Sequence, residues 1–166
     1  MRKLNPQGVK ILKMFHIFFG FAWIFGAIGL LTVLLVTNPQ TGDELYMRSR
    51  IVQILDDYLI IGGAIGAFFT GLIYSIWTNW GFFKHNWITV KWILILLQML
   101  VGTFVLGPYI NNNVEISDRL RDAALTDAEF LHNIKMGLIW GSIQTAFLIV
   151  YIWISVQKPW KKKKTA

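Results

Sequence analysis

The sequence predicts an all-α integral membrane protein: a bundle of four transmembrane helices with the N- and C-termini both in the cytoplasm. Hydrophobic residues make up 55% of the 166-residue chain, and its mean hydropathy is +0.51. Four apolar segments are each close to the ~20 residues that a helix needs to cross a hydrocarbon core. These segments are residues 14–36, 58–77, 87–107 and 136–156.

The charged residues separate into two groups when the chain crosses the membrane four times. One side receives all 9 Asp and Glu residues, and the other receives eleven of the 16 Lys and Arg residues. The two sides then carry +11 and −4, in agreement with the net charge of +7. Because short loops rich in Lys and Arg stay in the cytoplasm, we expect both termini there, in a bacterial inner membrane. The tail Lys161–Lys164 is expected to anchor this topology.

One membrane domain is expected to account for residues 1–166. Residues 41–44 (TGDE) and 126–129 (TDAE) have the spacing of capping boxes, which predicts helices starting near Gly42 and Asp127. The pair Gly107-Pro108 is expected to end the third helix. The predicted helices are about 10–36, 42–78, 87–107 and 127–156, with an outer interfacial segment at 108–126, part of it amphipathic.

Composition also excludes several classes of protein. The chain contains no cysteine, so disulfides, thiolate catalysis, iron–sulfur clusters and cysteine-based zinc sites are excluded. A pI near 9.8 would suggest nucleic-acid binding in a soluble protein. Here the basic residues lie beside the bilayer, so anionic lipid headgroups explain them better and no nucleic-acid partner is expected.

Small residues recur along the second predicted helix at spacings that allow close helix contact. Such surfaces let helix backbones approach each other in lipid. Packing inside the four-helix bundle is one explanation. A homodimer through helix 2 is the other, since the glycines occupy more than one side. The residues are Gly62, Gly63, Ala64, Gly66, Ala67 and Gly71.

His16 and Lys91 form the first group of polar residues inside the predicted spans, near the cytoplasmic face. Ionisable residues within a span are functional candidates, and His85 lies nearby in the loop before the third span. A neutral imidazole is a ready metal ligand, and a b-type haem between helices is one natural use of it. Alternatively, Lys91 extends to the headgroups and His16 is an interfacial histidine.

The second group lies near the outer face. Asp56 and Asp57 stand at the entrance of the second helix, while Glu129 and His132 stand on the first turns of the fourth helix. An acidic pair opposite a histidine is able to bind a cation or relay protons. An interfacial salt-bridge network is the alternative explanation.

Gln98 and Gln144 form the third group, near the middle of the membrane. They are able to hydrogen-bond each other and lock the third and fourth helices together. Contact with a quinone carbonyl or a porphyrin edge is the alternative. Thr70 is one of three threonines that either join the glutamines or bond to helix carbonyls.

The surroundings of the first group resemble a known family. His16, Trp23 and Gly26 follow the pattern H-x6-W-x2-G, and residues 87–91 follow W-x3-K at the start of the third helix. These motifs resemble the bacterial membrane protoporphyrinogen oxidase of the HemJ type and are similar to the copper-resistance D-type membrane proteins. The HemJ family is a four-helix haem-b family whose first-helix His and third-helix Lys are critical, so the resemblance implicates His16 and Lys91.

Residues 70–91 resemble more closely an uncharacterised group of bacterial four-helix integral membrane proteins, which share a T-x-W-G-hydrophobic-F-basic-H loop before the third helix. This likeness covers roughly half of the chain and implies no activity.

Two functions follow from the sequence. The first is a redox protein that binds b-type haem or handles porphyrin, with His16 as axial ligand. Lys91 or His85 would be the second ligand or the partner of a propionate, and a quinone would be an electron partner. Whether such a protein is a haem-dependent oxidoreductase stays open. The alternative is a non-enzymatic membrane subunit or small transporter that associates through its glycine-rich helix faces.

Overall fold

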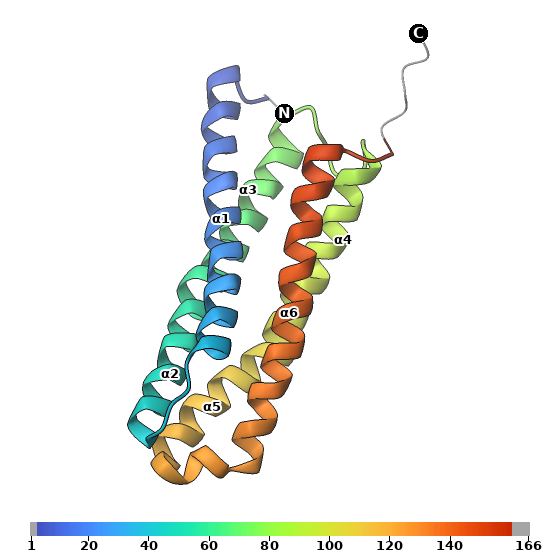
Figure 1. Ribbon diagram of the computed structural model, residues 1–166. Coiled ribbons are helices and arrows are strands. Elements are labelled where there is room, and N and C mark those ends of the chain that lie inside the picture. The colour runs from blue at the N-terminus through green and yellow to red at the C-terminus, as the bar shows by residue number, and fades with distance from the viewer. Residues whose placement is uncertain (1–2, 161–166) are drawn as a thin grey trace.

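The computed structural model describes residues 3–160, and all regular secondary structure in this part of the chain is helical (Figure 1). Four helical stretches are long and apolar enough to cross a membrane: Pro6–Val36, Gly42–Trp77, Asn86–Thr126 and Ala128–Gln157. The predicted fold class is therefore confirmed. The elements are α1 (Pro6–Val36), α2 (Gly42–Ile54), η1 (Leu55–Ile61), α3 (Gly62–Trp77), α4 (Asn86–Val101), η2 (Gly102–Leu106), α5 (Gly107–Leu120), η3 (Arg121–Thr126) and α6 (Ala128–Gln157).

The start of α1 and the end of α6 lie at the same end of the bundle, as four crossings require (Figure 1). We call this the basic end and the opposite one the acidic end, where the aspartates and glutamates gather. The tail Lys161–Lys164, expected to anchor the topology, lies outside the described residues.

Two helix starts agree with the sequence, although one cap differs. The side chain of Thr41 accepts a hydrogen bond from the backbone amide of Glu44 at 3.3 Å, and α2 begins at Gly42 as predicted. At α6 the prediction of a Thr126 cap is wrong. Asp127 is the N-cap and accepts from the amide of Phe130 at 2.8 Å. Thr126 belongs to the preceding 3₁₀ turn η3, so it is not positioned to cap α6.

The prediction that Gly107-Pro108 ends the third helix is wrong. The chain passes through the π-helix η2, in which the amide of Gly107 bonds to the carbonyl of Gly102, and continues directly into α5. Pro108 falls in the first turn of α5, where a missing N–H group is tolerated. The predicted outer interfacial segment, residues 108–126, is part of the helical bundle. It packs against α2 and α6, and Ile116 and Ser117 within it are 4% and 0% exposed.

Glycines on α3 bring it into close contact with α1. A Cβ atom added at Gly63 would lie 2.5 Å from the backbone nitrogen of Trp23, and one at Gly66 would lie 2.2 Å from the Phe19 ring. Packing inside the bundle therefore explains these two glycines. Gly62 has open space around it, so a homodimer through helix 2 would have to use this other side.

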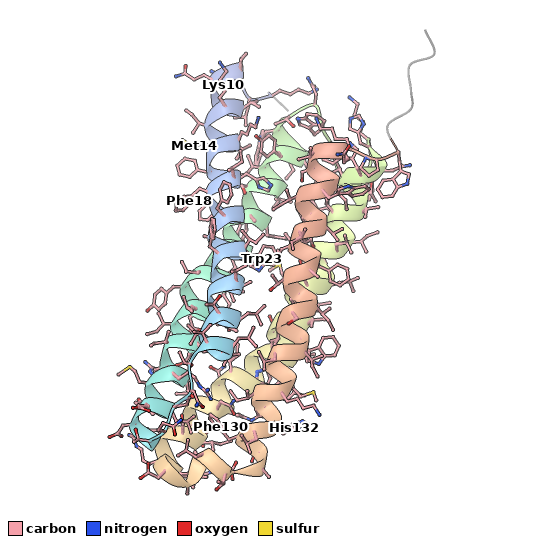
Figure 2. All side chains as sticks on the ribbon, viewed as in Figure 1. Lys10, Met14, Phe18, Trp23, Phe130 and His132 are labelled. Carbon is pink, nitrogen blue, oxygen red and sulfur yellow. The ribbon has the colours of Figure 1, made fainter. Side chains whose placement is uncertain are left out.

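The two halves of the bundle are packed differently. At the acidic end α2, α5, η3 and α6 enclose a core around Leu45 and Phe130. Towards the basic end α4 makes few close backbone approaches to α1 or α3, and side chains fill the space between the pairs α1–α3 and α4–α6. Trp23 of α1 extends towards α6 (Figure 2), where its ring lies 6.3 Å from that of Tyr151. By contrast, Met14 and Phe18 point outward, as side chains facing lipid do.

Candidate functional site

His16 is held on α1 by a hydrogen bond to the neighbouring helix. Its Nδ1 atom lies 2.7 Å from the hydroxyl oxygen of Thr70 on α3. That hydroxyl donates its own proton to the carbonyl of Gly66 at 2.6 Å, so towards His16 it acts as an acceptor. Nδ1 therefore carries the imidazole proton. In that tautomer the lone pair of the ring is on Nε2.

The Cε1 edge of the His16 ring lies beside Gly71 of α3. A Cβ atom added at Gly71 would lie 3.7 Å from Cε1 of His16 and 3.9 Å from the Trp92 ring of α4. Tyr74 contacts the imidazole edge-on, with ring centroids 5.8 Å apart. The imidazole is therefore surrounded by aromatic side chains and the bare backbone of a glycine, close to the boundary between α3 and α4.

Lys91 lies on α4, and its side chain extends to α6. Its Nζ atom donates to the hydroxyl of Ser155 at 2.8 Å, and Ser155 in turn donates to the carbonyl of Tyr151 at 2.6 Å. Within residues 3–160 no carboxylate lies within 4.0 Å of this ammonium. Lys91 lies near the start of α4, in the same basic-end half of the bundle as His16. The buried hydroxyl of Tyr151 has no hydrogen-bond partner there.

His85 occupies a different environment, immediately before α4. Its ring lies 5.7 Å from Trp80 and 6.2 Å from Trp87, and Lys158 places its ammonium 5.3 Å from the centre of the Trp80 ring. These contacts form an aromatic belt at the basic end. Neither a hydrogen bond nor a ring contact joins His85 to His16 in the described chain.

The predicted outer-face cluster is not brought together. Asp56 and Asp57 lie on η1, which packs against α1, whereas Glu129 and His132 lie on α6. His132 contacts Tyr109, with ring centroids 6.2 Å apart. Among residues 3–160 no group of three or more His, Asp and Glu residues is close enough to hold a metal ion.

The ion pairs at the acidic end involve other residues. Arg121 lies 3.3 Å from Asp43 and 2.5 Å from Asp118. The residue types predicted a salt-bridge network as one alternative for this face, but they did not identify its members.

Gln98 and Gln144 join α4 to α6 by hydrogen bonds, which was one of the two alternatives predicted for them. Each amide donates to the backbone carbonyl of the other residue, Gln98 to Gln144 at 2.8 Å and Gln144 to Gln98 at 3.0 Å. The bonds thus run from side chain to main chain, where the sequence predicted a bond between the side chains. Gln98 is 4% exposed, and its Oε1 atom is buried without a partner in the described chain.

This arrangement predicts that the two glutamines contribute independently to stability. Gln98→Leu and Gln144→Leu should each lower the free energy of unfolding by about 0.5–1.5 kcal/mol, because each removes one interhelical bond in lipid. The double variant should show the sum, since each lost bond ends on a backbone carbonyl that neither substitution removes. Denaturation of the wild type, the two single variants and the double variant in detergent measures the coupling energy between the two glutamines. A coupling above ~0.5 kcal/mol would show that the side chains bond each other.

Three residues of the His16 and Lys91 region were not assigned to it from the sequence. Thr70, predicted either to join the glutamines or to bond to a helix carbonyl, does the second and also contacts His16. The sequence does not single out Ser155 or Tyr151. Ser155 carried a weak signal, since it is a hydroxyl within an apolar helix near the depth of Lys91. The pairing of Thr70 with His16 depends on the rotation of α3 about its axis, which no local pattern records.

Comparison with known proteins identifies the family. The sequence model of a family described as "Predicted integral membrane protein (DUF2269)" matches residues 10–159, nearly the whole described chain. No curated protein sequence and no solved structure matches the chain. The four apolar helices agree with that description. The protein therefore belongs to the DUF2269 family of predicted integral membrane proteins.

Proposed function

We propose that this protein binds a b-type haem or a related porphyrin at the basic end, with Nε2 of His16 as an axial ligand, and acts in redox chemistry or porphyrin handling. One contact carries the proposal: Nδ1 of His16 lies 2.7 Å from the Thr70 hydroxyl, and because that hydroxyl donates to the carbonyl of Gly66, the imidazole is taken as the donor. Histidines that ligate metals almost always donate their other ring N–H to an acceptor, which fixes the tautomer and the orientation.

Lys91 supports an anionic ligand at the same place. Its ammonium has no carboxylate partner within 4.0 Å in residues 3–160, and an uncompensated charge inside a bundle is costly. The propionates of a haem would supply the missing negative charge. Lys91 is therefore proposed as a propionate partner or second ligand. It is preferred to His85, because the His85 ring packs against Trp80 and Trp87 of the belt.

A flat apolar ring would have to enter the boundary between the helix pairs α1–α3 and α4–α6 by separating the side chains that meet there. The boundary is filled mainly by side chains, among them Trp23, Phe68 and Trp92, which are of the types that line cofactor sites. A bound haem would supply one-electron chemistry. The residues of this chain would bind and orient it and exclude water.

The resemblance of residues 16–26 and 87–91 to the HemJ-type oxidase favours the same cofactor. It leaves the electron partner open, for which a quinone in the cytoplasmic leaflet of a bacterial inner membrane is proposed.

Substitution of the proposed ligand tests this function. The protein purified in detergent should show a Soret band, with sharp α and β bands after dithionite reduction, as isolated or after haem is added. His16→Ala should abolish these bands, and Thr70→Val should weaken haem affinity about 10–100-fold. His132→Ala, a histidine at the acidic end, is the matched control and should bind haem normally. Wild-type protein that stays colourless with added haem, or a His16→Ala variant with unchanged haem content, would contradict the proposal.

A non-enzymatic membrane subunit remains the second candidate, and the open face at Gly62 favours it. A dimeric protein mass in detergent, in a preparation that binds no haem, would support this candidate. A monomeric mass would contradict association through the face at Gly62, on which this candidate rests.

A further inference from the structure

A small cavity lies at the acidic end, where α2, α5 and α6 meet the last turn of α1. Its volume is about 20 Å³. Most of its wall is apolar, with Leu34, Val52 and Ile110 among the lining residues, but Arg48, Asn113 and Asn133 also line it, one from each of the three surrounding helices. It is separate from the region of His16 and Lys91, which is at the basic end.

The polar side chains around this cavity have hydrogen-bonding atoms without partners. Asn113 is 6% exposed and Asn133 is 4% exposed. Within the described chain Oδ1 of Asn113, Nδ2 of Asn133 and Nε of Arg48 are buried and make no hydrogen bond. An unpaired buried polar group costs on the order of 1–3 kcal/mol, so an occupant that bonds to these groups would be bound favourably.

The charge at the cavity is positive and uncompensated. Arg121, at the same end, has two carboxylate partners, whereas Arg48 has no carboxylate within 4.0 Å in residues 3–160. A half-buried guanidinium without a counter-charge favours an anion over water as the occupant.

The two amides are able to present donors to such an anion. Neither side-chain atom of Asn113 or Asn133 bonds to another described residue, so a half-turn of either amide breaks no hydrogen bond. Arg48 contributes a fixed donor through Nε. The lining residues thus include one positive charge and three potential N–H donors in an otherwise mostly apolar wall, and no carboxylate of the described chain contacts the arginine.

We propose that this cavity binds one small monovalent anion of halide size, such as chloride, between Arg48, Asn113 and Asn133. A cavity needs about 10–15 Å³ to hold one water molecule, so 20 Å³ admits a particle little larger than water and excludes sulfate or a lipid phosphate. Because the three residues belong to α2, α5 and α6, the bound ion ties these helices together at the acidic end.

Thermal unfolding in two salts tests the site. The protein in detergent is melted in sodium chloride and in sodium gluconate at equal ionic strength, since gluconate is too large to enter. Chloride at ten times its Kd should raise the Tm of the wild type by about 3–6 °C, with saturation. Arg48→Gln and Asn133→Leu should each abolish this difference. Arg50→Gln, which removes the same charge from a side chain bonded to Gln53, should retain it.

Two results would overturn the proposal. Equal melting of the wild type in both salts would mean that the cavity holds water only. A chloride effect that persists in Asn133→Leu, or in Arg48→Gln if that variant folds, would mean that chloride binds elsewhere.

Discussion

Gly63→Ala is expected to force α1 and α3 apart and to lower the free energy of unfolding by about 3 kcal/mol. The added Cβ atom would lie 2.5 Å from the backbone nitrogen of Trp23 and 2.9 Å from the carbonyl oxygen of Phe19. Both contacts are to backbone, so no side-chain rotation relieves them. The hydrogen bond between His16 and Thr70 spans the same two helices, and the substitution should therefore weaken the proposed cofactor site as well.

The adjacent glycine provides a matched control. A Cβ atom at Gly62 would meet nothing within 4 Å, so Gly62→Ala should be neutral or stabilising by up to ~1 kcal/mol, as Gly→Ala changes in helices are. Both variants are to be denatured in detergent, with the fluorescence of the 8 tryptophans as the signal. Equal stability of the two variants would show that α1 and α3 do not approach as closely as described.

Gly42→Ala is expected to detach the start of α2 from η3 at the acidic end. Its Cβ atom would lie 2.3 Å from the backbone carbon of Arg121 and 2.3 Å from the backbone nitrogen of Asp122. The amide of Gly42 also donates to the carboxylate of Asp122 at 2.5 Å. Relief of the clash lengthens this charge-assisted bond, so the loss of stability should be about 2–4 kcal/mol.

Hydrogen exchange resolves whether this loss is local. In Gly42→Ala, backbone amides of residues 42–45 and 121–126 should exchange faster, while those of α3 and α4 stay protected. Gly20→Ala, at a position with open space, should leave the pattern unchanged. Uniformly faster exchange along the chain would contradict a local effect.

Physical rules that act along the chain predicted the fold. Helix length against bilayer thickness gave the four spans, and the Thr41 and Asp127 regions marked two helix starts, because caps involve residues only three positions apart. The face of the membrane on which each charged loop lies followed as well, because successive spans cross the membrane in opposite directions. The similar depth of His16 and Lys91 is a prediction of the same kind, since depth is counted along a helix.

Features that depend on how helices rotate and bend were not predictable. The π-helix η2 lets the third stretch continue through Pro108, and nothing local in the sequence separates this from a helix end. Thr70 meets His16 across 54 residues. Arg48, Asn113 and Asn133 are polar residues of ordinary types, and only the packing of three helices gives them a shared cavity.

The reciprocal bonds of Gln98 and Gln144 also fix how α4 and α6 are allowed to move. Sliding one helix past the other by a single turn, about 5.4 Å, would break both bonds at once and leave the amides unpaired in hydrocarbon. The register of this pair is therefore locked, and α4 and α6 should travel as one rigid body. Any breathing of the bundle that admits a ligand must then be a tilt of this body against α1–α3, with the closely packed acidic end as its pivot.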